Sequence, residues 1–231
     1  MRLSHFFKGL SWLIGLNLLI KPLWVFGIDR QVQNSVGHEA YGAYFSILGL
    51  SYVLLFIADA GLTNMLNRQL AMEEGSAIKK LVGYKLILSL VYLVILLLIC
   101  WFTGIRQWEI ALLVGVIQVT NSLLIFFRSI LTGYQAFTTD AWLSIIDKSL
   151  MILICGALLY LPFASGLSLS HFLYLQAGCT AVSVLVAIYL IAKRGFPKDS
   201  VQSLRHLVQA TVPFTLLILL MSVHSRLDDI L

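Results

Sequence analysis

The chain has 231 residues, of which 59% are apolar and only 12% are Asp, Glu, Lys or Arg, and its mean hydropathy is +0.91. A water-soluble globular domain needs roughly twice this charged fraction to cover its surface, so that class is excluded. The net charge of +5 does not indicate nucleic-acid binding, because no Lys/Arg cluster is interleaved with exposed aromatic residues.

Seven apolar segments predict membrane spans. Each is expected to be helical, because a helix satisfies its own backbone polar groups where no water is available. The segments are Gly9–Ile28, Ala40–Gly61, Gly83–Phe102, Ile110–Phe127, Trp142–Leu161, Phe172–Ala192 and Leu207–Leu231. The sequence therefore predicts an all-α integral membrane protein.

The basic residues predict the orientation of these spans. If the amino terminus is cytoplasmic, twelve of the 16 Lys and Arg residues are assigned to the inner side. They are Arg2, Lys8, Arg68, Lys79, Lys80, Lys85, Arg128, Lys148, Lys193, Arg194, Lys198 and Arg205. Such an excess is typical of cytoplasmic segments, so we expect the amino terminus inside. No small-x-small cleavage site precedes Asp29, so we expect the first span to be retained.

The first span contains a cation, Lys21, in its outer half. Asn17 lies four residues earlier on the same helix face, and Pro22 follows and is expected to kink the helix. One interpretation is that Lys21 projects into a water-filled cavity and pairs with an anionic group. The other is that its long stem reaches the outer headgroups.

The loop after this span contains Asp29, His38 and Glu39, the nearest approach to an enzymatic site. Membrane glycosyltransferases place acidic residues in such a loop, but they generally also carry large outer loops, which are absent here. No catalytic motif is present, and we predict no enzyme activity, no cofactor and no metal site. The odd set Cys100, Cys155 and Cys179 is expected to be small buried apolar residues.

Polar residues also mark the second and fourth spans. Asp59 ends the second span and is expected to pair with Arg68, pair with a neighbouring helix, or cap the inner loop. Gln118, Asn121 and Arg128 fall within an arc of about 80° on an ideal helix. That stripe predicts either hydrogen bonds between helices or a cavity lining, with Arg128 near headgroup phosphates.

The seventh span bears Pro213 and ends at Leu231, so we expect a chain that stops inside its seventh helix. His224 and Asp228 form an i, i+4 pair that could bind a proton or make a structural hydrogen bond. The expected organisation is a six-helix transmembrane bundle over 1–195, a cytoplasmic linker over 196–206, and the start of a second bundle over 207–231.

Several motifs together resemble the Wzx-type polysaccharide (O-antigen) flippases. The similar residues lie in the first span, at the start and the end of the second span, after the fourth span, and in the seventh span. The residues are Asn17-Leu18-Leu19-Ile20-Lys21-Pro22, Gly37 to Gly42, Asp59-Ala60-Gly61-Leu62, Asn67-Arg68-Gln69-Leu70-Ala71, Arg128 with Leu131-Thr132-Gly133-Tyr134-Gln135, and Pro213 with Arg226-Leu227-Asp228.

This resemblance implies the fold shared with multidrug exporters and lipid II flippases, in which two bundles of about six helices each face a central cavity. The chain would supply the first bundle and the start of the seventh span of a transporter with roughly 12 to 14 spans. The cargo would be an undecaprenyl-pyrophosphate-linked oligosaccharide moved across a bacterial inner membrane. Other polysaccharide-assembly proteins would be further partners, beside membrane lipid and without nucleic acid.

The resemblance also distributes roles among the polar residues. Lys21 would contact the pyrophosphate, Asn17, Gln118 and Asn121 would line the cavity, and Arg30 would act at its outer mouth. Candidates for coupling or gating are Asp59, Arg128, His224 and Asp228. A cation-coupled drug exporter of the same fold should carry several acidic residues deep in the bundle, where the sequence indicates only Asp59.

Overall fold

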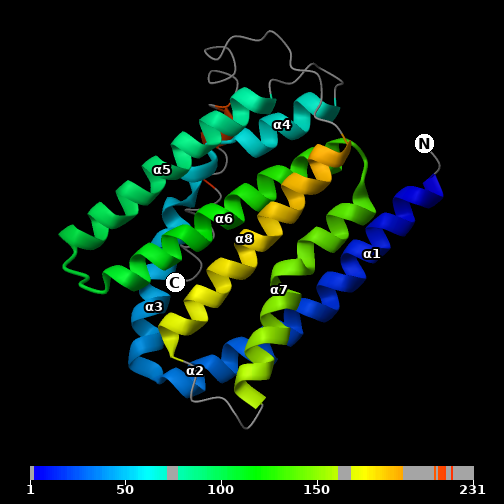
Figure 1. Ribbon diagram of the computed structural model, residues 1–231. Coiled ribbons are helices and arrows are strands. Elements are labelled where there is room, and N and C mark those ends of the chain that lie inside the picture. The colour runs from blue at the N-terminus through cyan, green and yellow to red at the C-terminus, as the bar shows by residue number, and fades with distance from the viewer. Residues whose placement is uncertain are drawn as a thin grey trace.

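The computed structural model describes residues 3–71, 78–160, 168–194, 211, 213–216 and 220. These residues form an all-helical bundle in which successive long helices run in opposite directions (Figure 1). The elements are α1 (Leu3–Pro22), η1 (Leu23–Asp29), α2 (Arg30–Val36), α3 (His38–Asp59), α4 (Leu62–Ala71), α5 (Ile78–Phe102), α6 (Trp108–Gly133), α7 (Phe137–Tyr160) and α8 (Leu169–Arg194).

Five of the described helices are long and apolar enough to cross a membrane, namely α3, α5, α6, α7 and α8. They correspond to the second to sixth predicted spans and extend most of them by several residues. The predicted all-α membrane class is therefore confirmed. The seventh predicted span lies largely outside the described residues.

The first predicted span differs from its expected form. The sequence placed a loop after Ile28, but the chain stays helical from Leu3 to Val36 through α1, η1 and α2. Pro22 lacks an amide proton and its ring crowds the preceding turn, and the helix widens to a π-helix directly after it. The Arg30 amide then donates to the Val25 carbonyl, five residues back.

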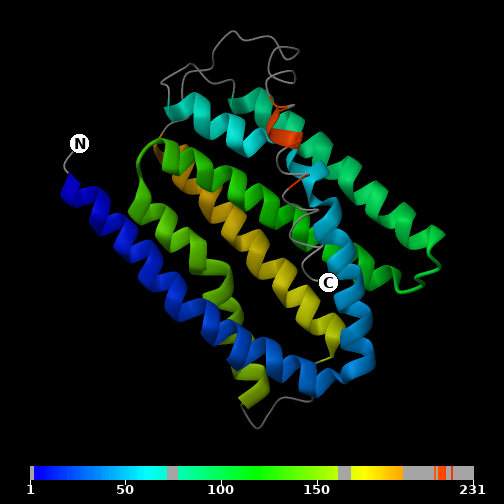
Figure 2. The ribbon, with the colours of Figure 1, turned by 180° about the vertical axis from the view of Figure 1, so that it is seen from behind.

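The helices α1 and α3 diverge from α2, and α6, α7 and α8 lie behind them (Figure 2). Along this layer α1 packs on α7, α7 on α8, and α8 on α6. Small side chains allow close approach, and the hydroxyls of Thr120 on α6 and Thr180 on α8 lie 3.0 Å apart. The α1–α7 interface is therefore separated from the α6–α8 interface by the contact between α7 and α8.

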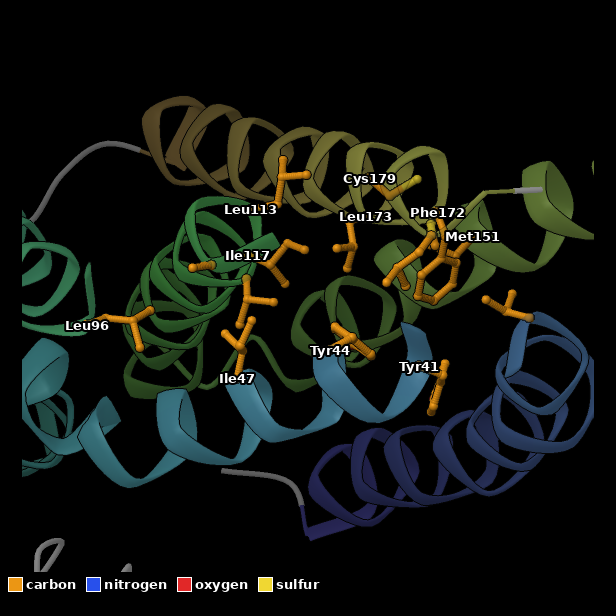
Figure 3. Packing of buried hydrophobic residues seen from close by; sticks show 14 of the residues in the cluster. Tyr41, Tyr44, Ile47, Leu96, Leu113, Ile117, Met151, Phe172, Leu173 and Cys179 are labelled. Carbon is orange, nitrogen blue, oxygen red and sulfur yellow. The ribbon is translucent and has the colours of Figure 1, made fainter. Parts of the chain in front are cut away.

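Two apolar clusters form the core of the described part of the chain. The larger joins α3, α5, α6, α7 and α8, with Tyr44, Ile47, Ile117 and Phe172 among its buried side chains (Figure 3). The smaller cluster includes Leu62, Met65 and Leu66 of α4, a helix that packs on α6. The sequence did not predict α4, because its ten residues are amphipathic and too short to span a membrane.

Candidate functional site

A lysine lies halfway along α7, the helix that packs on α1 and η1. Lys148 is the twelfth of the 24 residues of α7, and its side chain is one-quarter exposed. One turn earlier, Ser144 accepts a hydrogen bond of 2.9 Å from the Asn17 amide of α1. The Lys148 ammonium lies 4.8 Å from the ring centre of Trp24 in η1, within range of a cation–π interaction.

Two carboxylates accompany this lysine. Asp147 is buried, and its Oδ2 lies 3.4 Å from the Lys148 Nζ. Asp29, the last residue of η1, accepts a 2.9 Å hydrogen bond from the Tyr41 hydroxyl of α3. Burial raises the pKa of Asp29, and the Tyr41 hydroxyl and the charge of Lys148 oppose that rise. We call Asn17, Trp24, Asp29, Tyr41, Ser144, Asp147 and Lys148 the α1–α7 site.

The geometry leaves the Lys148 ammonium weakly held. A charge-assisted hydrogen bond between nitrogen and oxygen is normally about 2.7–2.9 Å long. The 3.4 Å separation from Asp147 is longer, so the ammonium can turn toward another anion without breaking a strong bond. Chemically, the site offers one cation for an anionic ligand and two carboxylates that could bind a proton or metal cation.

The sequence assigned Lys148 and Lys85 to cytoplasmic segments, but the structure places both inside long helices. Lys148 is central in α7, and Lys85 is fully buried on α5. The other ten Lys and Arg residues assigned to the cytoplasmic side still outnumber those assigned to the outer side. The orientation remains a prediction. The expectation that Asp59 alone lies near the bundle interior is also wrong, because Asp147 is buried beside Lys148.

The predicted cavity residues are distributed over several surfaces. Lys21 is exposed on α1, one turn after Asn17, and Arg30 is exposed at the start of α2. Gln118 is buried and Asn121 half-buried on α6, which packs on α8, α3, α4 and α5. Of the predicted cavity residues, Asn17 is the one whose hydrogen bond places it at the α1–α7 interface.

Two of the predicted coupling residues form ion pairs. Asp59 pairs with Lys85 of α5, so the expected pair with a neighbouring helix is observed. Its carboxylate also accepts hydrogen bonds from Thr63 of α4. Arg128 was expected near headgroup phosphates. It instead makes two hydrogen bonds to Asp140 of α7, at 2.6 and 3.1 Å.

The remaining predicted residues are His38, Glu39, His224 and Asp228. His224 and Asp228 lie outside the described residues. His38 and Glu39 are exposed at the start of α3. Within the described part of the chain, no three His, Cys, Asp or Glu side chains are placed to share a metal ion.

Sequence reasoning missed Lys148 and Asp147 as site residues, although a signal was present. Lys148 is six residues inside the predicted span Trp142–Leu161, deep enough that a charge requires a specific reason. Its neighbour Asp147 supplies the adjacent opposite charge. Lys21, which also lies inside a predicted span, was singled out by the same criterion, whereas Lys148 was not.

Comparison with known proteins gives one informative result. No protein-family model and no curated protein matches the sequence. A solved structure described as the outward-facing conformation of a multidrug resistance MATE family transporter of the MOP superfamily matches with a TM-score of 0.70 and 15% identity. The match covers 94% of this chain and 52% of that one. The chain has the fold of about half of that transporter.

At this level of identity the likeness shows the fold alone. The predicted fold, one bundle of a two-bundle transporter, agrees with it. The chain spans about half the length of the transporter chain it matches.

Proposed function

We propose that this chain forms one bundle of a transporter that moves an anionic, lipid-linked oligosaccharide across a bacterial inner membrane. The cargo is an undecaprenyl-pyrophosphate-linked oligosaccharide used to build a surface polysaccharide such as O-antigen. Movement proceeds by alternating access, from the cytoplasmic to the periplasmic leaflet, with no covalent chemistry. The half-transporter fold supports the transport step, and the α1–α7 site supports the charge of the cargo.

The observation that carries the anionic cargo is the weakly held Lys148 ammonium, halfway along α7 and partly exposed. A cation at this depth costs about 2.5–3.5 kcal/mol on insertion scales, so it requires a partner or a function. Asp147 offsets part of this cost, but at 3.4 Å it does not hold the ammonium firmly. A pyrophosphate has more charge than a single carboxylate and would compete for the same ammonium.

Lys21 and Arg30 add two further cations to this proposal, on the continuous helical segment from α1 to α2. Both are exposed and lie on α1 and α2, which are joined through η1. Lys148 of α7, which contacts Trp24 of η1, is the third basic side chain of this proposal. Lys21 is proposed as a further phosphate contact, and Arg30 as a cation at the outer mouth.

Deleting the gene in the organism that makes the protein tests this function. The expected result is loss of surface polysaccharide, with accumulation of the lipid-linked oligosaccharide in the cytoplasmic leaflet. Leaflet position is read by its accessibility to a membrane-impermeant glycosidase in spheroplasts. Normal polysaccharide with unchanged lipid-linked sugar would contradict the proposal.

A second candidate, a cation-coupled drug exporter, is favoured by the carboxylates of Asp29 and Asp147. Both are at least partly buried and could exchange a proton or Na⁺. Under this alternative, Asp147→Asn would raise drug susceptibility and leave surface polysaccharide intact. Under the proposed function the drug susceptibility is unchanged. A lipid II flippase is distinguished by loss of cell-wall synthesis instead of surface polysaccharide.

A further inference from the structure

The turn between α3 and α4, residues 59–63, is an unusual piece of backbone that we call the elbow. Ala60 has φ of 43° and Gly61 has φ of 74°, so two successive residues adopt left-handed conformations. Asp59 holds the first turn of α4, because its carboxylate accepts hydrogen bonds from the Thr63 hydroxyl at 2.5 Å and the Thr63 amide at 3.4 Å. The elbow therefore depends on the position of the Asp59 carboxylate.

A fully buried lysine fixes that carboxylate. Lys85 of α5 is 0% exposed, and its ammonium donates to Asp59 Oδ1 at 2.5 Å and to Ser122 Oγ of α6 at 2.7 Å. The ring centre of Phe126 lies 5.8 Å from the same ammonium. A charge without solvent is tolerated when it is paired and hydrogen-bonded, as here. The pair thus ties the elbow to α5 and α6.

A later segment of the chain contacts the elbow. The Thr215 hydroxyl donates a 2.7 Å hydrogen bond to the Ala60 carbonyl, and this joins residues 155 positions apart in sequence. A Cβ on Gly61 would lie 2.6 Å from the Phe214 Cβ and 2.9 Å from the Thr215 amide nitrogen. Two features therefore favour glycine at position 61: its left-handed backbone conformation and the close approach of residues 214 and 215.

We propose that Asp59 and Lys85 are a positioning pair that shapes the elbow as a docking surface for residues 213–216. Asp59 and Lys85 act through the backbone of residues 60 and 61 and do not touch the cargo. Because residues 213–216 follow the α1–α8 bundle in sequence, the elbow is the joint that links this bundle to the next helix. The proposal rests on the proposed function only for its transport measurement, and the docking measurement is independent of it.

The docking measurement is a photo-crosslink. The full protein is produced with p-benzoylphenylalanine at position 214, irradiated in membranes, and the crosslink to residues 59–63 is quantified by peptide mass spectrometry. Asp59→Asn leaves the buried Lys85 ammonium without a counter-charge, and Lys85→Met leaves the Asp59 carboxylate without its cation. In each single variant the crosslink is expected to fall about tenfold. The double variant Asp59→Asn/Lys85→Met removes both charges and keeps an acceptor for Thr63, and it restores the crosslink.

Two glycine variants test the surface directly, without changing the ion pair. Gly61→Ala introduces a Cβ into the space of Phe214 and abolishes the crosslink. Gly83→Ala is the matched control, because the position is helical and no atom lies within 4 Å of the added Cβ. A crosslink that survives Gly61→Ala overturns the docking surface.

The ion-pair variants separate positioning from charge chemistry. Unchanged crosslinking in both single variants overturns the proposal, as does a double variant that folds but fails to crosslink. A double variant that crosslinks normally and yet does not transport also overturns it, because the charges themselves would then be required. If a single variant does not fold, the proposal is tested by the double variant and by Gly61→Ala with its control Gly83→Ala.

Discussion

Lys148→Ala should weaken cargo binding far more than it weakens the fold. At about 4 Å, an ammonium and a phosphate charge attract by about 4 kcal/mol at an effective dielectric constant near 20. Part of this is offset, because the ammonium gives up its 3.4 Å contact with Asp147. A net loss of about 2 kcal/mol remains, in the range of a hydrogen bond to a charged group, and it corresponds to about 30-fold in affinity.

The effect on stability is expected to be smaller but has two parts. The lost cation–π contact with Trp24 costs about 0.5–1 kcal/mol, since Lys148 is partly exposed. The buried Asp147 also loses its counter-charge. The double variant Lys148→Ala/Asp147→Asn removes that second part. It should recover that part of the stability, leave the loss of the cation–π contact in place, and not recover cargo binding.

The assay places each variant at the chromosomal locus, so that the protein is tested as the cell makes it. Surface polysaccharide is measured against protein abundance in the membrane. Lys148→Ala should lower polysaccharide per molecule by more than tenfold, and Lys148→Arg should retain most of it. The matched control is Lys193→Ala at the exposed end of α8, which should have no effect. Normal polysaccharide in Lys148→Ala at normal abundance would refute the reasoning.

Three further predictions follow from single contacts. Lys21→Ala should abolish polysaccharide production in the same assay and Lys21→Arg should retain some, whereas full activity of the Ala variant would remove Lys21 from the cargo path. Tyr41→Phe deletes the 2.9 Å hydrogen bond to Asp29 and should cost about 1–2 kcal/mol, seen as a lower unfolding temperature of the purified protein in detergent. Arg128→Lys cannot make both hydrogen bonds to Asp140 and should cost about 1 kcal/mol by the same measurement; an unchanged unfolding temperature would count against the role of that pair.

Much of the fold is predictable from the sequence because hydrophobic length decides it. The second to sixth predicted spans coincide with α3, α5, α6, α7 and α8, with ends that differ by at most about six residues. The helix from Leu3 to Val36 was not, because Asp29 and Arg30 carry the polarity of a loop and yet continue the helix. The helix α4 is absent from a span prediction because it lies on the bundle instead of crossing a membrane.

The polar interactions are less predictable because their partners are distant in sequence. Asn17 was expected in a cavity with Gln118, but its observed partner is Ser144, 127 residues away. Lys85 was counted among the basic residues of the cytoplasmic side. Only the packing of α3 against α5 shows that it faces Asp59.

Transport of an anionic lipid by the purified protein is the most direct test of the central claim. The protein is reconstituted in liposomes with a fluorescent oligosaccharide linked to a polyprenyl pyrophosphate, and dithionite quenching from outside reports the leaflet of the label. Quenching should proceed past the outer-leaflet fraction with the wild-type protein, and should stop there with Lys148→Ala or with a neutral glycolipid of the same tail. Equal movement of the charged and neutral lipids, or movement of neither, would contradict the account.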